Sequence, residues 1–332
     1  MKSIGKSTFH FLILILFSFS GIIFCQSSGY RITGTINIGG NSWWDYLGID
    51  NSAHRLFVTN GNKLHIINLE NNAVIGEINN LNGAHGTAIA DEFGKGFISN
   101  GRNDTVTVFD LKSLKVIAEI HVTGKNPDAI VYDPFTKRVF TFNGRSSNVT
   151  AIDASTNKVV GTLNLNGNPE FAVTNGKGKM YVNIEDKNQI TEFDPKSLKI
   201  LHTWSIAPGK GPAGLAIDVK NNRLFSGCHN NLMIIADANN GRVIASEKIG
   251  KGVDACAFDP VTSFAFSSNG DGTLTIIKEL SPEKFKVVDN VKTMERARTM
   301  MLDNSTHNIY LSTLIGGKDN SKSFGVLILK RK

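Results

Sequence analysis

The sequence predicts an all-β protein, a seven-bladed β-propeller made of four-stranded blades. One aromatic residue recurs at intervals of 40 to 44 residues along the chain. The seven aromatics are Phe57, Phe97, Phe140, Tyr181, Phe225, Phe266 and Tyr310. A repeat of this length, built from short strands and Gly/Asn turns, is typical of a propeller with one blade per repeat. One such sheet cannot bury both of its faces, so we expect the repeats to stack around an axis.

A column of turn residues supports the same repeat, five to seven residues before each aromatic. Its members are Asp50, Asp91, Asp133, Asp218, Asp259 and Asp303, with Asn175 in the fourth repeat. Asp133 and Pro134 suit the first two positions of a type I turn. Asn-Gly pairs at 60–61, 100–101, 143–144 and 269–270 indicate a second turn, because both residues tolerate positive φ. No segment after residue 25 shows a sustained helical period.

The last repeat is one strand short, which predicts how the ring closes. It begins near Arg298 and ends with a strand at 324–329. The segment 32–38 (ITGTINI) resembles the outermost strand 159–165 (VVGTLNL) of the third repeat. We therefore expect it to supply the missing strand, so that no sheet edge stays open. A single propeller domain then spans residues 26–332.

Residues 1–25 are predicted to be a secretory signal peptide. Lys2 and Lys6 open the segment, an apolar run occupies 11–17, and small or apolar residues continue to Cys25. Lipidation of Cys25 is the alternative, which the bulky Phe24 before it disfavours. After residue 25, the apolar stretches are too short to span a membrane. We expect an exported protein, periplasmic or secreted, with no transmembrane segment after cleavage next to Gln26.

Charge and cysteine content limit the function further. The net charge of +7 falls to +5 when Lys2 and Lys6 are left out. The sequence contains no block of five like charges. This favours a solvated surface over a nucleic-acid interface. Cys228 and Cys256 fall in strands of neighbouring repeats, where we expect two small buried thiols in preference to a disulfide. Their spacing does not suggest zinc.

Three repeats carry a recognisable motif. The segments are Phe57-Val-Thr-Asn60 with Ala73-Val-Ile-Gly-Glu-Ile78, Phe97-Ile-Ser-Asn100 with Thr105-Val-Thr-Val-Phe-Asp110, and Asn148-Val-Thr-Ala-Ile-Asp153. They look like the YVTN-type repeat, and the chain resembles exported, YncE-like bacterial β-propeller proteins over nearly its whole mature length. The resemblance implies a seven-bladed exported propeller that acts as a binding or surface protein. Repeats 4, 5 and 7 depart from the motif.

Candidate site residues follow from counting back five positions from each turn residue, to the start of the innermost strand. In order they are Asp45, Gly86, Asp128, Glu170, Ala213, Asp254 and Arg298. Four carboxylates and one arginine in seven equivalent places predict a polar mouth of the central channel, because charges must be solvated or paired. We interpret it as a ligand or cation site. The alternative is a wet channel entrance with a salt bridge to Arg298.

Other candidates are expected on the same face. They are Trp43, Trp44, His85, Arg102, Arg145, Glu185, His229 and Arg296. The tryptophan pair suits either stacking on a ligand or plugging a gap between blades. His85 and His229 are more typical of surface histidines, since neither has a partner adjacent in sequence. We select Trp44, His85 and Arg296, together with Asp45, Asp128, Glu170, Asp254 and Arg298, as ligand-binding residues, and we predict no catalytic residue.

Two classes of function fit these features. The first is a non-catalytic, monomeric exported propeller that binds a small ligand, a cell-surface polymer or a protein, with a divalent cation as the one cofactor to consider. The second is a lactonase-like hydrolase in which ring carboxylates hold a divalent metal. A seven-fold ring is expected to space its members too widely for three or four converging ligands, which favours the first class. Single-stranded nucleic-acid binding through Trp43, Trp44 and the arginines ranks third, because a charge of +5 supports it weakly.

Overall fold

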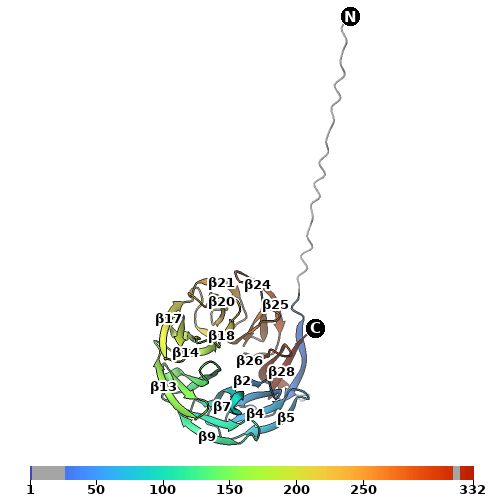
Figure 1. The fold of residues 1–332 in the computed structure, drawn as a ribbon. Helices are drawn as coiled ribbons and strands as arrows, with labels where there is room; N and C mark the ends of the chain where they lie inside the picture. Colours follow the sequence, from blue (N-terminus) through green and yellow to red (C-terminus); the bar gives the residue numbers. More distant parts are fainter. Residues whose placement is uncertain (2–26, 317–321) are drawn as a thin grey trace.

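The described part of the chain forms a closed ring of seven four-stranded antiparallel sheets (Figure 1). The computed structural model describes Met1, residues 27–316 and residues 322–332. The innermost strand of each sheet lies beside the innermost strands of its neighbours. The predicted seven-bladed β-propeller is thereby confirmed. In the described residues the only helical elements are three 3₁₀ turns, η1 (Asp91–Phe93), η2 (Gly144–Ser146) and η3 (Glu185–Lys187).

Blades 1 to 3 each follow the chain outward from the axis. Their strands are β2 (Trp44–Asp50), β3 (Arg55–Asn60), β4 (Lys63–Asn68) and β5 (Ala73–Ile78); β6 (Ala84–Ala90), β7 (Lys95–Asn100), β8 (Thr105–Asp110) and β9 (Val116–His121); and β10 (Pro127–Asp133), β11 (Arg138–Asn143), β12 (Asn148–Asp153) and β13 (Lys158–Asn164).

Blades 4 to 6 repeat this order, and blade 7 takes its outer strand from the start of the domain. Their strands are β14 (Pro169–Thr174), β15 (Met180–Ile184), β16 (Gln189–Asp194) and β17 (Lys199–Ser205); β18 (Pro212–Asp218), β19 (Arg223–Cys228), β20 (Leu232–Asp237) and β21 (Val243–Lys248); β22 (Val253–Asp259), β23 (Phe264–Asn269), β24 (Thr273–Ser281) and β25 (Lys284–Lys292); and β26 (Met300–Asp303), β27 (Asn308–Gly316), β28 (Lys322–Arg331) and β1 (Tyr30–Asn37).

The ring closes as the sequence predicted. β1 pairs with β28 from Tyr30 opposite Arg331 to Asn37 opposite Gly325. Residues 32–37 of the segment expected at 32–38 therefore lie in the outermost strand of the last blade, and Ile38 directly follows it. First and last repeats share one sheet, in which β1 covers the outer edge of β28.

The aromatic column forms the contact between blades. All seven anchors are buried, with at most 2% of each side chain exposed. Phe57 packs on Phe109 of the next blade, with 5.5 Å between ring centroids, and Phe140 packs on Phe193 at 6.1 Å. The turn acids act as predicted: Asp133 accepts a 2.9 Å hydrogen bond from the backbone N–H of Thr136.

The Asn-Gly pairs lie where the second strand turns into the third, as predicted. Gly61 has a φ of 62°, whereas the positive-φ positions of the corresponding turns in blades 2, 3 and 6 are Asp104, Ser147 and Gly272. Gly101 is needed for another reason, because a Cβ there would lie 2.5 Å from Nε2 of His85.

Two further expectations concern cysteines and export. Cys228 and Cys256 are free and buried, as predicted. The expected signal segment, with Cys25, lies outside the described residues apart from Met1. None of the helices among the described residues has the length and apolar character needed to cross a membrane.

The anchors carry a stability prediction. Replacing Phe140 with Ala removes a fully buried ring and should lower the free energy of unfolding by about 3–5 kcal/mol. Phe135→Ala is the matched control, because that ring is 53% exposed and its loss should cost much less. Urea denaturation of both variants checks this, and equal midpoints would contradict the packing described here.

Candidate functional site

The innermost strands of blades 1 to 6 each carry one extra residue near their start, and this bulge positions the candidate site in those blades. In blade 1, Trp44 pairs with Asn60 and Leu47 pairs with Val58, so three steps along β2 match two along β3. The same irregularity occurs at the start of β6, β10, β14, β18 and β22. A bulge bends the strand and redirects a side chain. The first bulged residue is the one that faces the channel mouth.

A hydrogen bond from the preceding blade marks the same position in four repeats. Side chains on the second strand of one blade donate to the backbone carbonyl of the bulged residue in the next. The pairs are Thr59 to His85 at 3.0 Å, Ser99 to Asp128 at 2.6 Å, Asn183 to Ala213 at 2.9 Å, and Ser268 to Arg298. The seven equivalent positions, called the ring residues below, are Asp45, His85, Asp128, Glu170, Ala213, Asp254 and Arg298.

The ring corrects the sequence prediction in blade 2. Counting from Asp91 selected Gly86, whereas the structure places His85 in the ring. Ala90 pairs with Lys95 as Asp50 pairs with Arg55, so the turn position of blade 2 is Ala90. Asp91 instead begins the 3₁₀ turn η1. Aligning Ile89 with Ile49 would have revealed the shift of one residue.

Neighbouring ring residues contact one another. Nδ1 of His85 lies 2.6 Å from Oδ2 of Asp45 and 3.4 Å from Oδ1 of Asp128. The expectation of a surface histidine was therefore wrong, because only 18% of the His85 side chain is exposed. The predicted salt bridge of Arg298 is present, with its Nε 3.3 Å from Oδ2 of Asp254.

Three ring residues are close enough to bind one ion. Asp45, His85 and Asp128 each offer a ligand atom, and the three atoms lie within 4.8 Å of one another. The expectation that the ring is too wide for converging ligands was wrong for blades 1 to 3. The imidazole of blade 2 reaches both neighbouring carboxylates and so bridges the gap between blades.

Burial makes the ring carboxylates hard to ionise. It raises the pKa of Asp45 to about 7, although the hydrogen bond from His85 opposes the shift. Burial and then the charges of Asp128 and Glu185 raise the pKa of Glu170 to about 9. The pKa of Asp128 and that of Asp254 are also raised by burial, with Arg298 opposing the shift in both cases. A positive charge entering the mouth would relieve this cost.

His85 is shifted in the opposite sense. Burial alone would lower its pKa, but the hydrogen bond to Asp45 and the charge of Asp128 outweigh burial and raise it. Both aspartates therefore favour the protonated form of the imidazole.

Two rings meet beneath the ring residues. Tyr46 of blade 1 and Phe171 of blade 4 have centroids 5.1 Å apart, although their blades are not neighbours. The pKa of Tyr46 is raised well above its usual value by burial and then by Asp254, Asp128, Asp45 and Glu170. The hydroxyl thus stays neutral beside all four carboxylates. Sequence reasoning missed this pair, because contacts across the axis leave no periodic signal.

The remaining candidates border the mouth on the side of blades 7 and 1. A pocket of about 560 Å³ is lined by Trp44, Asp45, His85, Arg296 and Arg298, among others. Trp44 is 5% exposed and packs on Phe324, so it acts mainly as a plug between blades. The guanidinium of Arg296 covers its ring at 4.7 Å. Five of the eight predicted ligand-binding residues therefore line this pocket. Asp128 and Asp254 contact two of them, and the charge of Asp128 raises the pKa of Glu170.

The other polar candidates lie further out. His229 is half-exposed and pairs with Glu185 at 3.3 Å. Arg102 and Arg145 are exposed on their turns. Arg102 covers the ring of Trp43 at 5.8 Å, and Trp43 in turn lies 5.3 Å from the His85 ring.

Comparisons with known proteins show the fold alone. No protein-family model matches the chain, and no curated protein matches it. The solved structure described as "Structure of U3-55K" is similar with a TM-score of 0.75. The match has 8% sequence identity and covers 90% of this chain and 98% of that one. Likeness at this identity shows that both share the propeller fold.

The raised pKa of Glu170 gives a pH-dependent prediction. In the unfolded chain a glutamate ionises near pH 4.3, whereas in the fold it does so at about 9. Stability should therefore fall as the pH rises through this window, and Glu170→Gln should remove the loss. Relative to the unmodified protein, we expect no change in melting temperature at pH 4 and a gain of at least about 2 °C at pH 9. Glu295→Gln, at an exposed position, is the control. A gain that is equal at both pH values would contradict the proposed cause.

Gly101 carries a second prediction. A methyl group at this position would push the His85 ring away from its place between Asp45 and Asp128. Gly101→Ala should therefore lower the pKa of His85 toward its usual value of about 6.5, as measured by NMR titration. Gly34→Ala is the control, since the nearest atom to its Cβ would be 3.8 Å away. An unchanged pKa in the Gly101 variant would show that the contacts do not hold the imidazole as described.

Proposed function

We propose that this chain is a non-catalytic binding propeller whose channel mouth holds a divalent cation, or the cationic group of a ligand. One observation carries the proposal: His85 is placed between Asp45 and Asp128, with ligand atoms of all three within 4.8 Å. Each of the three side chains comes from a different blade, so the packing of three consecutive blades assembles them.

The electrostatics support a cation. Four carboxylates share the mouth, and the pKa of each is raised by burial. Arg298 and protonated His85 offset only part of the charge that full ionisation would produce. Imidazole and carboxylate together suit Zn²⁺ or Mn²⁺ better than a soft, thiolate-seeking ion.

A metal-assisted hydrolase of the lactonase-like kind is the second candidate, favoured by the same three ligands. Three protein ligands leave coordination positions open, as a catalytic metal requires. We place binding first, because hydrolysis needs a base that activates the attacking water in addition to the metal ligands, and the three side chains of this cluster are all used as ligands. Single-stranded nucleic acid is the weakest choice, since an acidic mouth repels phosphates.

The proposal also covers the location of the protein, its oligomeric state and its partner. The apolar segment before Gln26 supports export to the periplasm or the medium. The resemblance to YVTN-type propellers supports a binding role for the loop face. We propose a monomer whose partner is a small ligand, a cell-surface polymer or another protein.

Calorimetric titration with Zn²⁺ and Mn²⁺ tests the proposal. The protein should bind one equivalent, and its affinity should rise between pH 6 and pH 8, because protons on Asp45 and His85 compete with the metal. Asp128→Ala with Glu170→Ala should weaken binding by about tenfold or more. It should not lower the melting temperature at neutral pH, because burial makes both carboxyl groups costly to ionise in the fold.

The control variant is His307→Gln. Its imidazole also contacts an aspartate, Asp259 at 2.9 Å, but lies on a turn between first and second strands, away from the mouth. Binding that survives the double substitution would contradict the proposed site. Metal-dependent turnover of a lactone, abolished by the same double substitution, would establish the hydrolase instead.

A further inference from the structure

A recurring side-chain network closes the end of several blades. In blades 2, 3 and 6 an asparagine ends the second strand, and its amide nitrogen donates to two side chains of the third strand. Asn100 donates to Thr105 at 3.2 Å and Thr107 at 2.8 Å. Asn143 donates to Asn148 and Thr150, and Asn269 to Thr273 and Thr275, at 2.9 to 3.1 Å.

Blade 1 keeps the asparagine but lacks both acceptors. The strand register places Lys63 and His65 where blade 2 has Thr105 and Thr107. Asn60 is 6% exposed, and its amide nitrogen has no hydrogen-bond partner among the described residues. A buried donor without a partner costs free energy that the other blades avoid.

The loop that leads into each blade also differs in blade 1. In blades 3 and 6 a glycine of this loop packs onto the asparagine: a Cβ on Gly124 would lie 2.5 Å from the Asn143 amide nitrogen, and one on Gly250 would lie 2.7 Å from that of Asn269. In blade 1, Cβ atoms on Gly39 and Gly40 would meet nothing within 4 Å. The loop is held away by backbone hydrogen bonds between residues 38–40 and Phe324.

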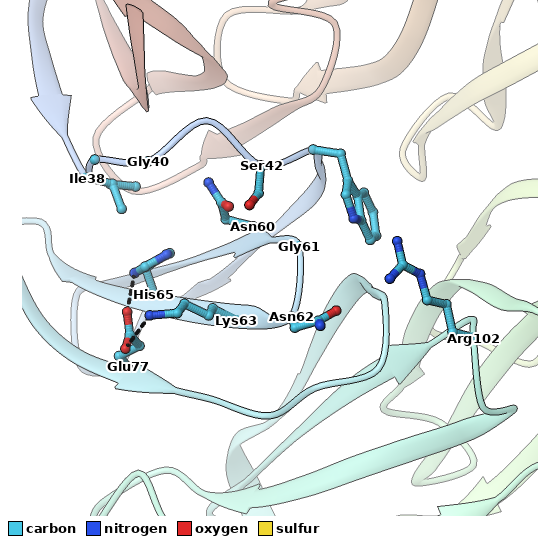
Figure 2. Close-up of a pocket in the computed structure, with 12 residues that line it drawn as sticks. Ile38, Gly40, Ser42, Asn60, Gly61, Asn62, Lys63, His65, Glu77 and Arg102 are labelled. Carbon is cyan, nitrogen blue, oxygen red and sulfur yellow. Dashed lines mark hydrogen bonds and ion pairs between the residues drawn. The ribbon is translucent and has the colours of Figure 1, made fainter.

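The space left beneath this loop is a pocket of about 620 Å³, called the blade-1 pocket below. It lies between the segment 38–43 and strands β3 to β5, with Arg102 at one side (Figure 2). Figure 2 shows the Asn60 amide turned toward the space under the loop, above the His65 ring. The size suits a monosaccharide or a molecule of similar dimensions.

The polar groups of the pocket define what it can bind. Asn60 supplies a donor, and Arg102 supplies a positive charge that no carboxylate pairs among the described residues. Lys63 is neutralised by Glu77 at 3.0 Å. Burial lowers the pKa of His65, and its Nδ1 lies 3.4 Å from Glu77, so the neutral ring presents Nε2 as an acceptor. A matching ligand needs acceptor oxygens, a hydroxyl donor and a negative charge.

We propose that the blade-1 pocket binds a small hydroxylated anion, a sugar that carries a carboxylate or a phosphate group. The anionic group pairs with Arg102, a ring oxygen or hydroxyl accepts from Asn60, and a hydroxyl donates to His65. Trp43, which lines the pocket beside Arg102, offers an aromatic surface to the sugar carbons. This site is separate from the cation site and does not depend on it.

Calorimetric titration with D-glucuronate, D-glucose 6-phosphate and neutral D-glucose tests the proposal. At least one of the two anions should bind saturably, and glucose should bind at least about tenfold more weakly. The anion that binds tells whether the pocket takes a carboxylate or a phosphate. Absence of saturable binding by either anion, or equal binding of glucose, would overturn the proposal.

Two variants locate the binding. Lys63→Thr with His65→Thr rebuilds the network of blade 2, so it should keep or raise the melting temperature while weakening the anion by about tenfold or more. Asn100→Ala is the matched control, since it removes a paired asparagine from the equivalent place and should lower stability without changing affinity. Asp128→Ala at the mouth should also leave anion affinity unchanged. Unchanged affinity in the Lys63/His65 variant would rule out the blade-1 pocket.

Discussion

Pairing of β1 with β28 is the contact on which the rest of this structure depends. It joins residues 30–37 to residues 325–331 and so completes the last blade with the first strand of the domain. Closure places blade 7 beside blade 1, which brings Arg296 against Trp44 and lets Arg298 join the ring. The chain that returns from β1 to the axis is the segment 38–43, which is also the roof of the blade-1 pocket. The blade-1 pocket and the part of the mouth that Arg296 and Arg298 form therefore depend on this closure.

Within the closed ring, a bulge at the start of six of the seven innermost strands positions the site. In four successive blades the sequence places Asp45, His85, Asp128 and Glu170 at this position. Burial raises the pKa of the three carboxylates in this set, and the charges of other carboxylates add to the shift at Asp45 and Glu170. The turn acids, such as Asp133 and Asp303, instead accept hydrogen bonds from their own turns. Several carboxylates that are costly to ionise at one place are typical of a site that binds a ligand of opposite charge.

Most of the fold and much of the mouth could be predicted from the sequence, because both repeat. The aromatic anchors, the closing strand and six of the seven ring positions follow from regular spacing. The seventh could not be found by counting, since η1 shifts the turn of blade 2 by one residue and hides His85. The close approach of His85 to two aspartates depends on how far side chains reach between blades, which spacing does not encode.

Other features needed the strand register or the packing itself. The contact between Tyr46 and Phe171 joins blades that are distant in the ring, so no periodic pattern signals it. The blade-1 pocket becomes visible only when Lys63 and His65 are matched with Thr105 and Thr107 across paired strands. In the sequence, Lys63 and His65 are only two polar residues that differ from the threonines of blade 2. In the structure, this difference leaves the amide nitrogen of Asn60 without hydrogen-bond acceptors.

Anomalous X-ray diffraction from crystals grown with Zn²⁺ or Mn²⁺ would locate a cation bound by the ring residues. We expect a single strong anomalous peak at the channel mouth, within about 2.0–2.3 Å of one ligand atom each from Asp45, His85 and Asp128. A peak bound elsewhere on the protein, or none at the mouth at millimolar metal and pH 8, would contradict the claim that the ring residues form a cation site.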